Sequence, residues 1–376
     1  MQLKKLNNPV LDIVISSLVY LPRPSNLRYF WNFGSLLGLS LGTQLVTGIF
    51  LAITFSGERS ISFYTVALVS RDCGSGWAIR IAHANGARIF FFFLYIHIAR
   101  GVYYMSFYHA HTWFVGVIIF LLTMGTAFLG YVLPWGQISF WGASVITGLL
   151  GAIPGVGGEA VLWLWGHVAV DNPVLVRFFS LHFLLPFVIT AIRLIHLIYL
   201  HKTGSRNPLG VSRSADKVFF HPYFRVKDLA GFFFTLLFLF YIVGFFPWTL
   251  GDPENFIMAN PMLTPVHIKP EWYFLFAYAI LRSIPRKLGG VLALVLSVIM
   301  LFVFPYQKNT KFKGLIFYGP LKIYYWSWVV SVVLLTWIGA RPVEEPYIIA
   351  GQLLSVFYFR FYILHYLLIK LYDKTV

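Results

Sequence analysis

Four histidines lie in pairs inside long apolar stretches, where an ionisable residue is costly and is therefore a candidate for function. His83 and His97 share one stretch, and His182 and His196 share another. The positions in each pair differ by 14. In an α-helix this spacing falls about 40° short of four turns and covers about 21 Å, so both members lie on one face at different depths.

The histidine spacing suits the axial ligands of haem, because neutral imidazole is a common ligand of haem iron. If the two helices run in the same direction, His83 faces His182 and His97 faces His196. The pattern predicts two bis-histidine haems stacked across a membrane. With both axial positions filled, such irons carry electrons but offer no open position to a substrate.

Glycines repeat at the same interval on two other apolar stretches. Gly34 and Gly48 differ by 14 positions, as do Gly116 and Gly130. Glycine lets a flat macrocycle approach a helix backbone where a Cβ would clash. We therefore expect two helices to supply the ligands and two to supply flat walls.

Arginines lie one turn from two of the histidines, Arg80 before His83 and Arg100 after His97, and are candidate partners of haem propionates. A single helical histidine is more often a packing residue than a ligand, and paired small residues are common where helices pack. Two histidine pairs and two glycine pairs at one spacing favour the haem interpretation.

The composition requires that these residues be positioned by membrane helices. Of 376 residues, 59% are hydrophobic and only 11% are charged, whereas a soluble domain carries roughly 25% charged residues. This excludes a soluble nucleic-acid binder and a disordered tail. The single cysteine, Cys73, excludes an intrachain disulfide scaffold. The net charge of +16 is attributed to cationic loops at one membrane surface.

The predicted fold class is an all-α polytopic membrane protein with eight transmembrane helices, because a spanning helix needs about 20 mostly apolar residues. The expected spans are 33–53, 77–104, 113–133, 174–200, 229–247, 288–305, 321–340 and 348–370. Pro and Gly interrupt 134–173, where short interfacial helices such as 137–150 are expected. The segment 271–284 is too short to cross and predicts a half-buried helix.

Two regions are expected. Residues 1–205 form a four-helix di-haem bundle with the interfacial helices, and 206–376 form a C-terminal four-helix region. Loop charges set the orientation, because basic loops favour the negative side of a membrane. The basic connections contain Lys202, Arg206, Arg213, Lys217, Arg225 and Lys227, and then Lys308, Lys311 and Lys313. Both termini are therefore expected on that side, and the 134–173 loop, without Lys or Arg, on the other.

Over nearly its whole length, the sequence resembles the mitochondrial cytochrome b family of the ubiquinol–cytochrome c reductase. The segments that carry the resemblance are WNFGSLLG from Trp31, GW at Gly76, HANGA from His83, GYVLPWGQISFWGASVIT from Gly130, TGS at Thr203, NPLG at Asn207, HPYF at His221, KD at Lys227, PEWYFLFAYAILRSIP from Pro270 and GQLLS at Gly351.

The resemblance implies a two-haem subunit of respiratory complex III that works by the Q cycle, oxidising ubiquinol on the positive side and reducing ubiquinone on the negative side. His83 and His182 would bind the low-potential haem b, and His97 and His196 the high-potential haem b. The implied partners are a Rieske iron–sulfur protein, a cytochrome c-type subunit, other complex III subunits, a second copy in a homodimer, and membrane lipids, with no nucleic acid. The implied location is the mitochondrial inner membrane, with both termini in the matrix.

The positive-side quinol site is expected around Glu271. Pro270 suits a helix start and an acid suits the first turn, so Glu271 is either a helix cap or a proton acceptor for quinol. The resemblance favours the acceptor. It also implies that the same pocket is shaped by Tyr131, Gly142, Tyr273 and Tyr278.

The negative-side quinone site is expected around His201 and Asp228, with Lys227 beside the aspartate, because these residues can supply protons to quinone carbonyls. Read alone, they are more simply polar residues where helices leave the membrane, and the resemblance reverses that preference. Further expected contacts are Asn32 and Ser35 in the quinone cavity, and Ser106 and Trp113 at a haem propionate or interface.

Several arginines depart from the family pattern. Arg88 and Arg193 lie at membrane depth, where an unpaired arginine costs at least ~2.5–3.5 kcal/mol, and the family usually has small or apolar residues there. Arg206 and Arg286 stand where serine is common. One hypothesis is that AGA or AGG codons at some of these positions are decoded as serine, which the mass of the peptide at position 88 would test.

Two alternatives compete with the cytochrome interpretation. A non-redox polytopic transporter with a histidine proton relay explains histidines in the membrane but not the glycine repeat. Another di-haem quinone oxidoreductase, such as a dehydrogenase anchor or a photosynthetic relative, explains both. In the photosynthetic relatives the polypeptide is split into two chains, and one more residue separates the histidines of the later pair. The continuous chain and the spacing of 14 found here therefore favour the respiratory branch.

Overall fold

The computed structural model describes residues 8–211, 216–307 and 309–375. Arg213 and Lys308, two of the cations in the basic connections, lie outside these ranges. The described part contains long helices α2 (Phe33–Thr54), α4 (Gly76–Tyr103), α5 (Ala110–Val132), α8 (Asn172–Thr203), α9 (Tyr223–Phe245), α11 (Lys287–Ile299), α12 (Gly319–Gly339) and α13 (Tyr347–Thr375). Shorter helices are α1 (Pro9–Leu18), α3 (Ser62–Arg71), α6 (Gln137–Gly148), α7 (Gly157–Trp165) and α10 (Leu275–Ser283).

Short 3-10 helices join these elements: η1 (Tyr29–Trp31), η2 (Ser106–Tyr108), η3 (Leu149–Ala152), η4 (Pro253–Phe256), η5 (Trp272–Phe274), η6 (Met300–Tyr306) and η7 (Leu315–Phe317). Because η6 directly continues α11, Lys287–Tyr306 is one candidate span, and eight helices in the described ranges are long and apolar enough to cross a membrane. This confirms the predicted all-α polytopic class. The helices expected within 134–173 and 271–284 are α6, α7 and η5–α10.

The long helices pack in pairs within two groups. In the first group, α2 packs mainly against α4, and α5 mainly against α8. In the second, α10 packs against α11, α12 and α13. Helix α9 follows the bundle in sequence yet packs on α2 and α4, so it extends the first group in space. The division at 205/206 stays a prediction.

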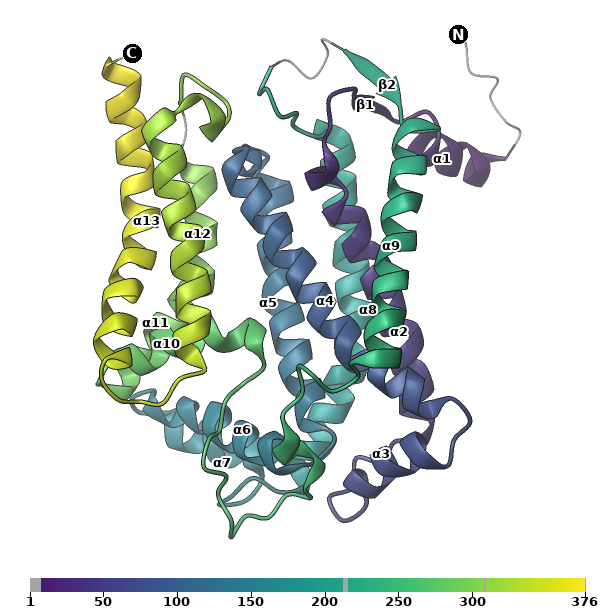
Figure 1. Cartoon of the computed structure of the whole chain (residues 1–376), viewed down its shortest axis with the longest axis vertical. Helices are drawn as coiled ribbons and strands as arrows, with labels where there is room; N and C mark the ends of the chain where they lie inside the picture. Colours follow the sequence, from purple (N-terminus) through teal and green to yellow (C-terminus); the bar gives the residue numbers. More distant parts are fainter. Residues whose placement is uncertain (1–7, 212–215, 308, 376) are drawn as a thin grey trace.

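The two ends of the molecule differ in content (Figure 1). Helix α1, the last turns of α13 and a small antiparallel ribbon of β1 (Pro22–Pro24) and β2 (Lys217–Phe219) lie at one end. Helices α3, α6, α7 and α10 lie toward the other end. The ribbon was not expected, since three residues are too few to give a strand signal.

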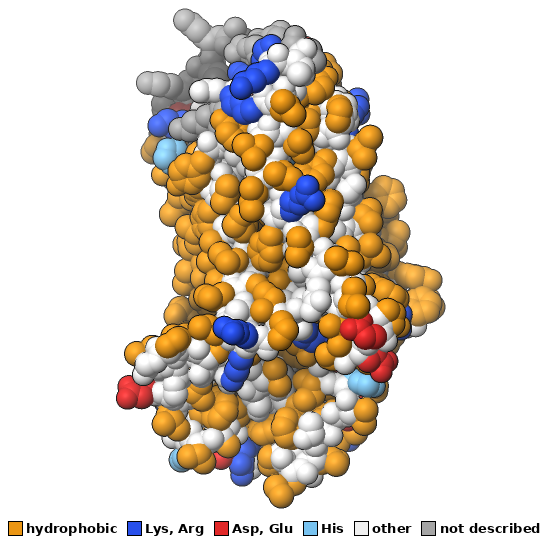
Figure 2. Space-filling model, turned by 90° about the vertical axis from the view of Figure 1, so that its left-hand side faces the viewer, with side chains coloured by type: hydrophobic (Ala, Val, Ile, Leu, Met, Phe, Trp, Pro, Cys, Tyr) orange, Lys and Arg blue, Asp and Glu red, His pale blue; other side chains and the backbone are white. Residues whose placement is uncertain are grey.

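The sides of the molecule are apolar. Figure 2 shows hydrophobic side chains along most of one side, with basic side chains mainly toward its ends. Only 6% of the most apolar window of α8 is buried, against 44% for α4. Large exposed residues on α8 include Leu184, Leu194 and Ile198. A surface of this kind must face lipid or another apolar protein surface.

Candidate functional site

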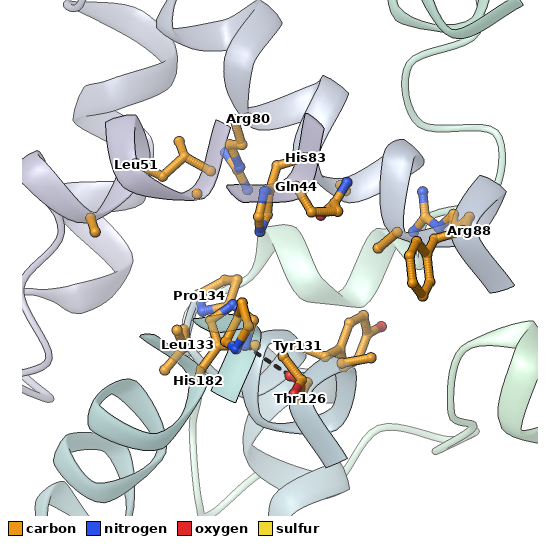
Figure 3. A pocket seen from close by; sticks show the side chains of 18 of the residues that line it. Gln44, Leu51, Arg80, His83, Arg88, Thr126, Tyr131, Leu133, Pro134 and His182 are labelled. Carbon is orange, nitrogen blue, oxygen red and sulfur yellow. Dashed lines mark hydrogen bonds between the residues drawn. The ribbon is translucent and has the colours of Figure 1, made fainter. Parts of the chain in front are cut away.

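One histidine pair faces across the space between the α2–α4 and α5–α8 helix pairs (Figure 3). The ring centres of His83 and His182 are 6.3 Å apart, and their planes are almost perpendicular at 88°. His182 Nδ1 donates to the carbonyl oxygen of Thr126 at 2.8 Å. Thr47 Oγ1 lies 2.8 Å from His83 Nδ1. Because the Thr47 hydroxyl donates its hydrogen bond to the Thr43 carbonyl, His83 Nδ1 is the donor in this contact. Both Nε2 atoms are thus left available as metal ligands.

This geometry fits one metal between the two rings. An imidazole nitrogen binds a metal at about 2 Å, which places the centres of two rings on opposite sides of one metal about 6 Å apart. Hydrogen bonds that hold Nδ1 fix both ring orientation and tautomer, as is usual for metal-binding histidines. The chemistry of the donor set therefore fits a bis-histidine haem.

Each glycine of the 14-residue repeat contacts one of the four histidines. A Cβ at Gly48 would lie 3.1 Å from His83 Cε1, and a Cβ at Gly130 would overlap the His182 ring. The glycines thus make room for the ligand rings themselves, a closer constraint than the predicted contact with a macrocycle.

The second histidine pair repeats these contacts at the other depth. A Cβ at Gly34 would lie 3.4 Å from His97 Cε1, and one at Gly116 would lie 3.1 Å from His196 Cε1. One feature differs, because Arg100 Nη2 donates to His97 Nδ1 over 3.3 Å. A ligand that binds iron through Nε2 carries its proton on Nδ1, so haem binding requires Arg100 to turn away. Its predicted contact with a propionate would require the same movement.

A cavity of about 310 Å³ surrounds the first pair. Its wall includes His83, His182, Gly48, Gly130 and Arg80. The Arg80 guanidinium lies 5.3 Å from the Trp248 ring centre, and its Nη1 donates to Ser70 Oγ at 2.9 Å. The same cavity continues to Glu271, Tyr131 and Tyr273, so the predicted haem and quinol sites share one space.

A buried ion pair lies at the Glu271 end of this cavity. Arg88 Nη2 lies 2.6 Å from Glu271 Oε1, and Arg88 Nε lies 3.0 Å from Oε2. Their side chains are only 7% and 6% exposed. Arg88 therefore has a carboxylate partner and does not carry the cost of an unpaired arginine. Arg193, in contrast, has no hydrogen bond or ion pair among the described residues.

Tyrosines line the cavity beside Glu271. The Tyr273 ring stacks on Phe91 with centres 4.0 Å apart, and Tyr95 donates to the Tyr273 carbonyl oxygen. Burial raises the pKa of the Tyr273 phenol well above its usual value, so it remains a neutral donor. Gly142 and Tyr278 are not among the residues that line this cavity.

A polar cluster lies at the end of the molecule that carries both termini. Asp228 Oδ1 accepts hydrogen bonds from Asn32 Nδ2 at 2.9 Å and from Ser35 Oγ at 2.8 Å. Arg23 lies close enough to Asp228 and His201 for electrostatic interaction and donates to Ser205. The structure thus brings Asn32 and Ser35 to Asp228, and Arg23 lies near both this carboxylate and His201.

Two family models match the chain. Residues 18–204 match the model described as cytochrome b/b6/petB, and residues 258–359 match cytochrome b (C-terminal)/b6/petD. The chain belongs to the cytochrome b family. This family binds haem b, in agreement with the fit of the histidines, and the match gives no support to the transporter alternative.

A solved structure supports the same family. A chain of a hyperthermophilic respiratory Complex III is 29% identical, and the two structures align with a TM-score of 0.92 over 97% of each chain. The two family matches lie on either side of α9, in which Lys227 and Asp228 occupy the first turns.

The remaining predicted contacts of this cytochrome b family member are less direct. Lys227 Nζ donates to the Leu27 carbonyl at 2.7 Å. Trp113 Nε1 donates to the Leu301 carbonyl at 2.8 Å, which occupies its only donor. Ser106 Oγ is buried without a partner in the described part of the chain and remains free for a ligand.

Sequence reasoning missed Arg23 at the Asp228 cluster. Arg23 lies in β1, and its guanidinium reaches the cluster because the ribbon places β1 beside the start of α9. Burial lowers its pKa, while the nearby Asp228 opposes that shift. The only signal in the sequence was a cation between two prolines, Pro22 and Pro24, which fix an extended backbone.

Proposed function

We propose that this chain is the membrane subunit of a quinol–cytochrome c oxidoreductase, in which two haem b groups carry electrons across the bilayer in a Q cycle. The observation that carries the proposal is the facing pair His83 and His182, with one glycine–histidine contact repeated at all four ligand positions. When bound, haem supplies a reversible one-electron carrier. His83 with His182, and His97 with His196, would hold the two haems, which would supply electron transfer and not substrate binding at iron.

The four histidines divide between two haem sites. His83 and His182 hold the low-potential haem beside the quinol cavity, and His97 and His196 hold the high-potential haem toward the termini. Arg80 and Arg100 lie beside these pairs as cations for the propionates. Ser106, with its free hydroxyl, joins the high-potential site.

Ubiquinol oxidation takes place in the cavity that includes Glu271. The Glu271 carboxylate accepts a quinol proton, while Tyr131 and Tyr273 form the surrounding wall. Gly142 lies in α6, outside that wall, and is assigned to the ubiquinol site through the family resemblance. This end faces the positive side of the membrane.

Ubiquinone reduction takes place at the Asp228 cluster. Asp228 and His201 deliver protons to the two carbonyl ends of the quinone. Asn32 and Ser35 orient the Asp228 carboxylate through hydrogen bonds to Oδ1. Lys227, next to Asp228 in α9, adds positive charge to the same cluster.

The partners follow from the Q cycle and from the similarity to a respiratory Complex III chain. They are a Rieske iron–sulfur protein and a cytochrome c-type subunit that take the other electron, further complex III subunits, a second copy of the chain and membrane lipids. The chain lies in the mitochondrial inner membrane with both termini in the matrix. Support comes from the basic connections at the end with the termini.

Rapid mixing of the purified complex with ubiquinol tests this function through the rise of reduced b-type absorbance. We expect Glu271→Gln to slow electron transfer from ubiquinol in the Glu271 cavity to the b haems at least tenfold. The matched control Glu254→Gln, in η4 at the same end of the molecule, should retain the wild-type rate. Equal rates in wild type and Glu271→Gln, with entry at the other site blocked by Asp228→Asn, would refute the assigned acceptor.

A further inference from the structure

The Arg88–Glu271 ion pair is not explained by haem or quinol binding alone. Arg88 uses Nε and Nη2 to hold both carboxylate oxygens, a two-point contact that fixes the position of the carboxylate. Its remaining Nη1 donates to Asn85 Oδ1 at 3.0 Å. The guanidinium thus has partners on two sides.

Asn85 is itself held firmly. It is 1% exposed, and its Nδ2 donates to the carbonyl oxygens of Pro247 at 2.9 Å and Ile81 at 3.2 Å. The hydrogen bond to Asn85 therefore fixes one side of the Arg88 guanidinium. Glu271, in contrast, lies at the junction between an irregular segment and η5, and its side chain makes no capping hydrogen bond to η5.

The two-point contact leaves Glu271 able to accept a proton. A carboxylate has about four acceptor positions, of which this pair uses two. The pair also lines the cavity together with Tyr131 and Tyr273. A hydroxyl in the cavity can therefore donate to Glu271 while Arg88 remains bound.

We propose that Arg88 is a positioning residue that holds the ionised Glu271 at the cavity wall and releases it once the carboxylate has taken up a proton. This inference rests on the proposed function. The quinol O–H bond breaks and an O–H bond forms on Glu271, which becomes neutral. The pair then loses its charge–charge attraction, and Glu271 turns away and gives the proton to water. The ionised carboxylate returns to Arg88, and the cycle is complete.

The test compares Arg88→Met, which keeps length without charge, and Arg88→Lys, which keeps charge without the two-point contact. We expect Arg88→Met to lower kcat of ubiquinol oxidation in the intact complex at least tenfold, with KM changed less than twofold. Arg88→Lys should lie between Arg88→Met and wild type. In a Glu271→Gln background, Arg88→Met should cause less than a further twofold loss. Arg193→Met is the matched control, since Arg193 also lies in a span and has no carboxylate partner among the described residues.

Two further measurements make the test independent of turnover. Infrared difference spectra on adding ubiquinol should show a protonated-carboxyl band that Glu271→Gln removes and Arg88→Met alters. Peptide mass should give arginine at position 88. Serine at that position, an unchanged rate in Arg88→Met, or fully additive losses in the double variant would each overturn the inference.

Failure of this inference is distinct from failure of the proposed function. If Glu271→Gln oxidises ubiquinol at the wild-type rate, the acceptor role itself is wrong. If Glu271→Gln is slow but the loss from Arg88→Met is additive, Glu271 is an acceptor that Arg88 does not position. Haem content and visible spectra of the variants separate both outcomes from misfolding.

Discussion

At the residue scale, each of the four paired histidines touches a glycine of a neighbouring helix. The spacing of these residues was visible in the sequence, because helix geometry alone places positions 14 apart on one face. The Arg88–Glu271 pair was not visible. Its members are 183 positions apart, and no local period links α4 to η5.

Gly130→Val should selectively abolish haem binding at one of the two proposed sites. The added side chain would overlap the His182 ring, so His182 loses the position that faces His83. We expect more than half of one b-type component to be lost, with the other retained. Haem extraction and a reduced-minus-oxidised spectrum measure this. Gly125→Val, also on α5 but with open space around its Cβ position, is the control. Equal haem content in the two variants would contradict the prediction.

Thr47→Val should weaken the same site without removing a ligand. It deletes the hydroxyl that holds His83 Nδ1 at 2.8 Å, and loss of such a partner typically lowers metal affinity about 10–100-fold. Haem release on dilution measures the change. Thr43→Val serves as the comparison, because the Thr43 hydroxyl donates only to its own helix at Leu39. An identical release rate in both variants would argue that Thr47 does not orient His83.

At the scale of elements, the eight spans and short helices followed from apolar length and from Pro and Gly interruptions. Two features did not. The β1–β2 ribbon depends on pairing between segments that flank the whole bundle, and the position of α9 on α2 and α4 depends on packing rather than on chain order. Both features place Arg23 near Asp228, so the aspartate could be predicted from the sequence but this nearby cation could not.

A second element-scale contact joins the start of α12 to the end of α13. Tyr318 Oη donates to Asp373 Oδ1 at 2.9 Å and accepts from the Phe312 backbone N–H at 3.1 Å. Tyr318→Phe should destabilise the protein by about 1–3 kcal/mol, because it removes two partly buried hydrogen bonds that contribute about 0.5–1.5 kcal/mol each. Thermal unfolding in detergent measures this. Tyr306→Phe, with its side chain 72% exposed, should change little.

The Tyr318 contact should also depend on pH. Burial, with Asp373 beside it, raises the pKa of the Tyr318 phenol to about 12, above its ordinary value of about 10. The folded state thus holds this proton more tightly than the unfolded state. Its contribution is fully present below about pH 10 and is lost as the pH rises toward 12. Tyr318→Phe should lack that part of the alkaline loss, and equal slopes in both proteins would contradict the assignment.

At the scale of the whole molecule, the chain is an apolar body with different chemistry at its two ends. The cavity beside Glu271 lies toward one end, with α3, α6 and α7, and the Asp228 cluster lies at the other, with α1 and the last turns of α13. The two histidine pairs lie at different depths between these ends. The loop charges and the even number of spans predict that both termini lie on one side of the membrane, and this stays a prediction.

Membrane-impermeant thiol reagents can test that orientation. Cys73, the single cysteine, follows α3 and is partly exposed, so labelling is expected only from the positive side of sealed vesicles. A cysteine placed at Lys374 in a Cys73→Ser background should be labelled only from the negative side. Labelling of both positions from the same side would contradict the arrangement.

The central claim is a two-haem electron path held by four histidines, and a redox-titrated visible spectrum of the purified complex tests it most directly. We predict two b-type components with different midpoint potentials. His182→Ala should remove one component and His196→Ala the other. A single component, a colourless protein, or two components that survive both substitutions would contradict the account.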